Sequence, residues 1–156
     1  MKDFGKLKLF AKDADDLKVL SSLLQDSLVP GVDMEFDNSK QKFIMVANRF
    51  CWEKVPGEKL DIVDGKRVHE RRICAVIINH VFALKKRNWP EHFRDSFFNF
   101  LAINLLANKK GIETHPFLQI EFSDGPSLQF SIDKVNVLLV DLDLGHPTRL
   151  KPHHNI

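Results

Sequence analysis

The chain has 156 residues, of which 44% are hydrophobic and 28% charged, with seven glycines and seven prolines. This length is typical of one globular domain, and the composition excludes a disordered, collagen-like or disulfide-dense chain. The longest apolar run, 73–78, is far shorter than the ~18 residues of a membrane helix, and the N-terminus shows no apolar signal segment. We therefore expect a cytoplasmic protein without a membrane segment, with one domain over 1–145 and a C-terminal tail over 146–156.

The formal net charge of +2 is unevenly distributed along the chain. Residues 66–94 contain eight Lys or Arg and two Glu, so this segment carries +6 and the remainder −4. Such an asymmetry can mark a face for an anionic partner. Basic residues at the ends of strands would produce the same pattern, so the charge alone does not assign a partner.

Apolar runs bounded by turn residues predict about seven to eight antiparallel strands. The predicted strands are 7–11, 32–37, 42–50, 72–79, 80–87, 97–106, 117–122 and 127–132. The run 42–50 is apolar on both faces, which is typical of an interior strand. Residues 72–87 could also form one long bent strand, and the polar segment 51–70 is expected to be a long surface loop.

Two helices are predicted. Asp13 is a good N-cap for the first, over 14–27, along which leucines recur at spacings of three and four. The second is predicted over 133–142 from helical spacing of its apolar residues, with a β-prone strand over 137–140 as the alternative.

These elements predict an α+β fold that is mainly an antiparallel β-sheet or roll, with helices near 14–27 and 133–142. Seven strands followed by a C-terminal helix are similar to the pleckstrin-homology roll. The N-terminal strand and helix would be additions to that pattern.

Neither the cysteines nor the histidines predict a metal or cofactor site. Cys74 lies inside an apolar run and should pack in the core, whereas Cys51 could be more accessible beside Trp52. The two cysteines are too few for a secreted disulfide framework, and the seven histidines are scattered without metal-ligand spacing. We therefore expect no metal and no cofactor.

The most distinctive segment, 48–53, follows an apolar strand and should emerge at the rim of the sheet. An amide, a guanidinium and an indole there could bind a ligand together, because Arg suits planar anions and Trp anchors interfaces. The leading hypothesis is therefore a non-catalytic binding or accessory domain that recognises a protein partner or a small anion. Its predicted residues are Asn48, Arg49, Trp52, Arg71 and Arg72. The structural alternative pairs Arg49 with Glu53.

Two other functions remain open. Nucleic-acid or polyanion binding would use the basic segment 66–94, through Lys85, Lys86, Arg87 and Trp89. An enzyme would need an acid or base with a shifted pKa, for which the candidates are Glu53, Glu70 and His80. The carboxylates Asp141 and Asp143 are expected on a solvated helix face. An exposed Trp52 or Trp89 could anchor a homodimer.

Several segments resemble a family of small alphaproteobacterial proteins that is known only as a domain of unknown function. The segments are 7–9, 13–17, 24–26, 46–53, 101–103, 124–125 and 141–145, of which Asn-Arg-Phe-x-Trp-Glu over 48–53 is the most specific. Genes of the family often lie near that of histidinol dehydrogenase, which implies a cytoplasmic setting and assigns no activity. The resemblance implies no catalytic or binding residues. His146-Pro147 differs from the end expected of the family.

Overall fold

The computed structural model describes residues 5–54, 62–63, 66–67, 69–106, 116–143 and 146–148. Within them, one α-helix, α1 (Ala14–Leu24), accompanies thirteen strands. The strands of the N-terminal half are β1 (Lys8–Ala11), β2 (Leu28–Pro30), β3 (Met34–Asp37), β4 (Lys42–Phe50), β5 (Ile62–Val63), β6 (Lys66–Arg67) and β7 (His69–Ile78). The remaining strands are β8 (Val81–Arg87), β9 (Phe97–Leu106), β10 (Phe117–Phe122), β11 (Ser127–Ile132), β12 (Val137–Asp141) and β13 (His146–Thr148).

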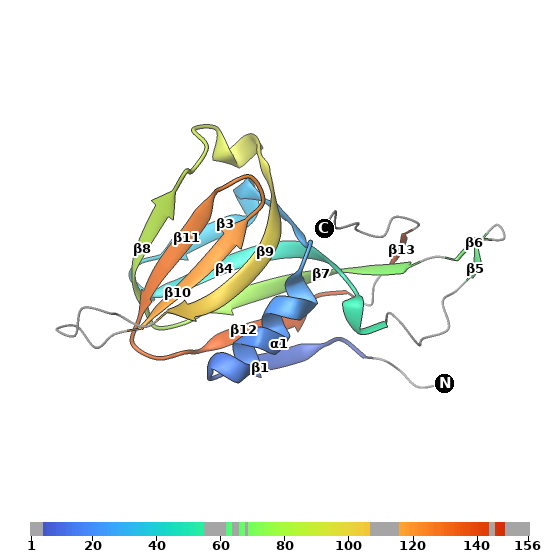
Figure 1. The fold of residues 1–156 in the computed structure, drawn as a ribbon, viewed down its shortest axis with the longest axis horizontal. Coiled ribbons are helices and arrows are strands. Elements are labelled where there is room, and N and C mark those ends of the chain that lie inside the picture. Colours follow the sequence, from blue (N-terminus) through green and yellow to red (C-terminus); the bar gives the residue numbers. More distant parts are fainter. Residues whose placement is uncertain are drawn as a thin grey trace.

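Eleven strands form one strongly bent antiparallel sheet in the order β1-β12-β7-β4-β2-β9-β10-β11-β8, with β3 beside β4 and β13 beside β7. The short strand β2 joins the two halves, because it pairs with both β4 and β9. The half containing β1, β12, β7 and β4 therefore lies behind the half containing β9, β10, β11 and β8 (Figure 1).

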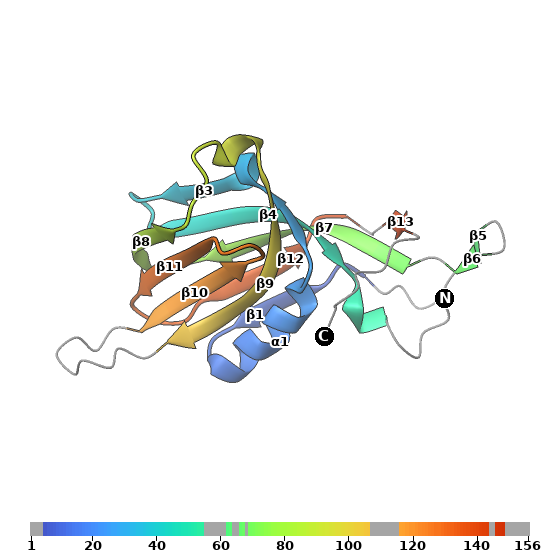
Figure 2. The same ribbon diagram turned by 45° about the horizontal axis from the view of Figure 1, so that its top comes forward.

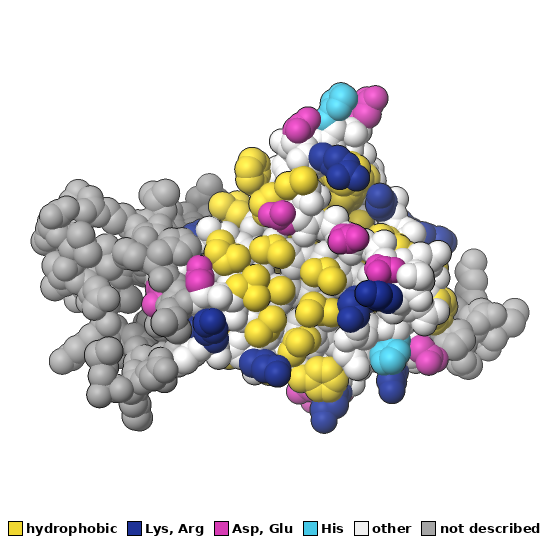
Figure 3. All heavy atoms as spheres, turned by 180° about the vertical axis from the view of Figure 1, so that it is seen from behind, with side chains coloured by type: hydrophobic (Ala, Val, Ile, Leu, Met, Phe, Trp, Pro, Cys, Tyr) yellow, Lys and Arg dark blue, Asp and Glu magenta, His cyan; other side chains and the backbone are white. Residues whose placement is uncertain are grey.

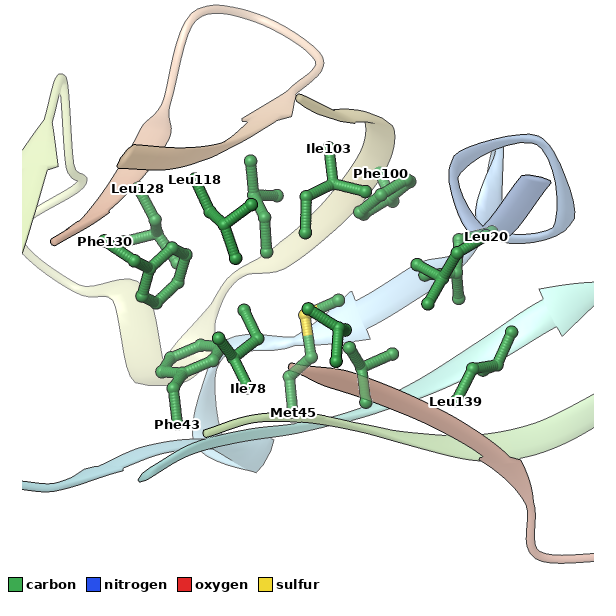
Figure 4. Packing of buried hydrophobic residues seen from close by; sticks show 14 of the residues in the cluster. Leu20, Phe43, Met45, Ile78, Phe100, Ile103, Leu118, Leu128, Phe130 and Leu139 are labelled. Atoms are coloured by element: carbon green, nitrogen blue, oxygen red, sulfur yellow. The ribbon is translucent and has the colours of Figure 1, made fainter. Parts of the chain in front are cut away.

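The core fills the space between these two layers (Figure 4). Phe43 of the back layer packs against Phe130 of the front layer, with ring centroids 4.8 Å apart. Helix α1 contributes three buried leucines, Leu17, Leu20 and Leu24, at the side of the sandwich. It also satisfies an edge of β9, since the backbone N–H of Ile103 donates to Ser21 Oγ at 3.1 Å.

The predicted first helix is confirmed, although it ends at Leu24. The Asp13 side chain accepts a hydrogen bond from the backbone N–H of Asp16, as expected of an N-cap. The predicted strands over 32–37 and 42–50 are confirmed as the antiparallel pair β3 and β4. Residues 72–87 form two strands, β7 and β8, around a turn in which His80 has a φ of 60°.

The predicted helix over 133–142 is wrong. Its second half is strand β12, which lies between β1 and β7. Burial alternates along β12 with a period of two, and backbone hydrogen bonds tie the segment before it to the β7–β8 turn (Asp133 N to His80 O, Asn79 N to Asn136 O). The similarity to a pleckstrin-homology roll depended on this C-terminal helix and is lost with it.

The predicted loop 51–70 contains a short 3₁₀ turn, η2 (Trp52–Lys54), and strands β5 and β6 before β7 begins. Residues 55–61, 64–65 and 68 lie outside the described part of the chain. The predicted tail 146–156 begins with β13, which pairs with the start of β7. Residues 149–156 of this tail lie outside the described part of the chain.

Candidate functional site

Arg49, Arg72 and Asp141 form a buried ionic network on the inner face of the back layer. Arg49 and Asp141 have fully buried side chains, and their shortest contact, from Arg49 Nε to Asp141 Oδ1, is 2.8 Å. Arg72 Nη1 lies 3.0 Å from Asp141 Oδ2. These residues come together because β4, β7 and β12 are neighbours, and Arg49 and Arg72 are directly opposite in register. One carboxylate therefore bridges two guanidinium groups.

Two glutamates at the edge of the network also accept hydrogen bonds from its arginines. Glu53 accepts two hydrogen bonds from Arg49, at 2.9 and 2.8 Å, and Glu70 accepts one from Arg72 at 2.6 Å. Asp141 also accepts from the backbone N–H of Leu7 at 2.9 Å, so the network anchors the segment leading into β1.

The pKa values of the network follow from these contacts. Burial alone would lower the pKa of Arg49, but hydrogen bonds to Asp141 and Glu53 outweigh it and raise the pKa above its ordinary value. Burial alone would raise the pKa of Asp141, but the hydrogen bonds from Arg49, Leu7 and Arg72 hold it below its ordinary value. All three ionisable members are therefore charged at neutral pH.

The five residues of the predicted rim lie on different sides of the sheet. Arg49 and Arg72 point inward, and the four hydrogen bonds of Arg49 all go to Glu53 and Asp141. Arg71 points the other way, where its guanidinium lies 5.7 Å from the centroid of the Phe50 ring and donates to the backbone carbonyl of Asn48 at 3.2 Å. The alternative pairing of Arg49 with Glu53 is what the structure contains.

The tryptophan of the predicted rim, Trp52, contacts other residues of the same chain. Trp52 Nε1 donates to the backbone carbonyl of Gln25 at 2.6 Å, and the indole packs against Phe50 with centroids 4.6 Å apart. Asn48 Oδ1 is buried and has no hydrogen-bond partner among the described residues. Trp52 is therefore half-buried and acts as a bridge between η2 and the end of α1.

The residues considered for an enzyme take part in structural contacts. Glu53 and Glu70 belong to the ionic network, and His80 lies in the β7–β8 turn. Cys74 is buried in the core as predicted, whereas the expected accessibility of Cys51 is wrong, since this residue is 1% exposed. Burial raises the pKa of each thiol to about 12.

The prediction of a solvated helix face for Asp141 and Asp143 is also wrong. Asp141 is buried on a strand, and Asp143 accepts a hydrogen bond from the backbone N–H of Ile73 at 3.1 Å. Among the described residues, no group of three His, Cys, Asp or Glu side chains could hold a metal ion. In the same part of the chain, no helix has the length and apolar character needed to cross a membrane.

A cleft of about 290 Å³ opens at the other end of the sandwich, between β3 and β8. Figure 2 shows the ribbons of these two strands at this end of the molecule. It forms there because, within the described residues, β3 pairs only with β4 and β8 only with β11, so the bent sheet does not close. A short 3₁₀ turn, η3 (Phe93–Asp95), lies beside the opening. The lining consists of Met34, Glu35, Phe36, Phe43, Leu84, Lys86, Trp89, Phe93, Arg94 and Leu128.

Two cations meet the aromatic wall of this cleft. Lys86 Nζ lies 5.2 Å and Arg94 Cζ 5.4 Å from the centroid of the Phe93 ring. The indole of Trp89 stacks on Phe98 with centroids 4.6 Å apart. Its Nε1 is buried and has no hydrogen-bond partner in the described chain. A buried indole N–H usually finds an acceptor, and none of the described residues supplies one here.

The predicted polyanion-binding residues do not form one surface. Lys86 lies opposite Leu128 and faces the inside of the sandwich, whereas Lys85 and Arg87 lie opposite Gln129 and Ser127 and face outward. One face of Trp89 is already covered by Phe98. The sheet therefore separates the basic run into one cleft residue and two outward ones.

A family model described as "Protein of unknown function (DUF2948)" matches residues 7–154. The chain belongs to this family. No curated protein and no solved structure matches the chain. The family therefore agrees with the resemblance to a domain of unknown function, and it assigns no activity.

Sequence reasoning missed most of the cleft. Phe93 and Arg94 lie between the predicted strands 80–87 and 97–106, and Met34 and Glu35 lie in a predicted strand, but nothing in either segment indicates that they meet. The sequence signal for this cleft is the aromatic–basic combination around Trp89, which by residue type alone indicates a polyanion.

Proposed function

We propose that this protein is a non-catalytic binding domain that holds a small amphipathic anion, such as a medium-chain carboxylate, in the β3–β8 cleft. The observation that carries the proposal is the meeting of an apolar wall with two cations and an indole N–H that lacks an acceptor. An alkyl or aryl group would pack against Phe36, Phe43 and Leu128. The anionic head would lie near Lys86 and Arg94 and away from Glu35, which lies opposite Ile44 on the outward side of β3.

The size of the cleft favours a small ligand. Its volume of about 290 Å³ is close to the lower end of ordinary ligand sites, which begin at about 300 Å³. Ligand pockets of this kind are mostly apolar with a few polar groups that fix orientation, and this is the composition of the cleft. A folded partner or a nucleic-acid strand would need a wider surface.

The proposal keeps the small anion of the leading hypothesis and moves it away from Arg49. A ligand at Arg49 would have to replace the hydrogen bonds that this side chain makes to Asp141 and Glu53. At the cleft, by contrast, Trp89 Nε1 would gain an acceptor, and within the described part of the chain no ion pair of Lys86 or Arg94 would be broken.

The test is a titration with octanoate. Trp52→Phe leaves Trp89 as the only indole, so its fluorescence reports directly on the cleft. We expect saturable binding, weakened about three- to tenfold by Lys86→Gln because a charge-assisted contact is lost. Calorimetry on the chain without the Trp52 change checks that the reporter variant behaves normally.

Lys85→Gln is the matched control, because Lys85 is the sequence neighbour of Lys86 on the opposite face. Its affinity for octanoate should stay within about twofold of the unmodified chain. Absence of saturable octanoate or octanesulfonate binding below about 10 mM would reject the proposal. Equal weakening by the two lysine changes would instead indicate a general charge effect, as the polyanion alternative requires.

A further inference from the structure

The outward side of the back layer is apolar over the middle of four neighbouring strands, between Lys42 at one end and Arg71 at the other. Its residues are Phe10 on β1, Leu138 and Val140 on β12, Ile73, Ala75 and Ile77 on β7, and Ile44 and Val46 on β4. We call this set the outer apolar face. Figure 3 shows it directly, with hydrophobic side chains gathered in the middle and charged side chains around them.

This face is not the one that forms the core. The inward residues of the same strands, including Met45, Val76 and Leu139, already pack against the front layer. A sheet with one face in water normally alternates apolar and polar residues, whereas strands apolar on both sides are typical of sheets covered on both sides. Contiguous apolar patches on soluble proteins commonly mark interaction surfaces. We therefore expect another molecule to cover the outer apolar face.

The charges at the two edges of this face are opposite. At the β1 edge, Lys8 and Lys12 are exposed beside Phe10, and the Lys12 ammonium lies 5.8 Å from the centroid of that ring. At the other edge, Glu35 of β3 is exposed and lies directly opposite Ile44 of β4. Asp37, two residues further along β3, lies opposite Lys42, and its carboxylate already accepts hydrogen bonds from Ser39 Oγ at 2.7 Å and from the backbone N–H of Lys40 at 3.2 Å. Glu35 is therefore the acidic group that a partner would meet.

We propose that the cover is a second copy of this chain, packed face to face about a twofold axis. An axis in the plane of the interface and parallel to β7 places the β1 edge of one copy over the β3 edge of the other. Lys8 and Lys12 then approach Glu35 of the other copy on both sides of the dimer. The perpendicular in-plane axis would place like charges together, so the edge charges select one of the two arrangements.

The central strand suits this arrangement. β7 lies in the middle of the order β1-β12-β7-β4-β3, so its outward residues lie near the proposed axis. Ala75 and Ile77 would each meet their own equivalents, and Ile44 would meet Leu138. The small side chain of Ala75 allows the two sheets to approach at the axis. An anionic membrane is a poorer cover, because the acidic β3 edge would face its headgroups.

The test is the oligomeric state of the full chain by analytical ultracentrifugation over about 1–200 μM. We expect a concentration-dependent dimer, which Ile77→Lys converts to a folded monomer, as checked by circular dichroism. Leu101→Lys is the matched control, since it places the same charge on an exposed leucine of β9 and should leave the dimer intact.

A charge exchange keeps the proposal testable even where Ile77→Lys fails to fold. Lys8→Glu or Glu35→Lys alone should raise the dimer dissociation constant about three- to tenfold, and the two changes together should restore it. A monomer throughout the concentration range would overturn the proposal and favour a different protein or a membrane as the cover. A dimer unaffected by Ile77→Lys, or single reversals that are not restored by their combination, would also overturn it.

Discussion

Removing the charge of Asp141 tests whether the buried network stabilises the fold. Asp141→Asn keeps the size of the side chain but replaces one of its two accepting oxygens with an amide N–H₂, which only donates. The carboxylate receives two hydrogen bonds from Arg49 at 2.8 and 2.9 Å, one from Arg72 at 3.0 Å and one from the Leu7 N–H at 2.9 Å. The amide can replace only part of this set.

The expected loss is about 3–5 kcal/mol in the free energy of unfolding, the usual cost of leaving a buried charge without its partner. Arg49 keeps Glu53, and Arg72 keeps Glu70, so the lower half of this range is the better expectation. For a domain of this length, about 3 kcal/mol corresponds to roughly 10 °C in the melting temperature. Urea denaturation followed by circular dichroism measures both the midpoint and the slope.

The same variant makes a signed prediction for pH. The pKa of Asp141 is lowered in the folded state, so its stabilisation is present above the unfolded value of about 3.8 and is lost as pH falls through the folded value. The stability difference between the two proteins should therefore stay constant from pH 7 to about 5 and narrow below about 4.

Asp133→Asn is the control, since Asp133 is exposed in the loop before β12 and should change stability by less than about 0.5 kcal/mol. A loss below about 1 kcal/mol for Asp141→Asn at pH 7 would show that water or rearrangement compensates the arginines. A difference that grows as pH falls would contradict the assignment of a lowered pKa.

Two further predictions concern buried groups. Burial raises the pKa values of Cys51 and Cys74 to about 12, so at pH 8 each thiol should react with a thiol reagent only as fast as the protein opens. In denaturant both should react rapidly. Fast stoichiometric labelling of the native protein would contradict this. Gly31→Ala should lower the unfolding free energy by about 3 kcal/mol, because a Cβ there would lie 1.8 Å from the backbone carbonyl oxygen of Phe93, and an unchanged melting temperature would show that η3 can move away.

Local signals in the sequence predicted those elements that depend on local physics. The N-cap and the leucine stripe predict the first helix, and turn residues between apolar runs predict the strands. The helix prediction over 133–142 is wrong because the apolar residues of this segment fit a period of 3.6 as well as a period of 2. Its partners β1 and β7, which decide between the two, are distant in the sequence.

The candidate sites depended on such distant pairings even more strongly. Arg49 stood out as a possible anion binder, but the carboxylate that neutralises it is 92 residues away. The cleft depends on which two strand edges remain unpaired, and a single sequence does not indicate this. The sequence shows the residue types of the basic run. It does not show that the two faces of β8 separate Lys86 from Lys85 and Arg87.

Substitutions at two neighbouring residues of β7 separate the role of its inward face in folding from the role of its outward face in association. Val76 points inward and is fully buried, so Val76→Ala should lower the unfolding free energy by about 2 kcal/mol and leave the dimer dissociation constant nearly unchanged per folded chain. Ile77 points outward, so Ile77→Lys should abolish the dimer while the monomer stays folded. Parallel effects of both changes on stability and association would mean that the outer face supports the fold directly.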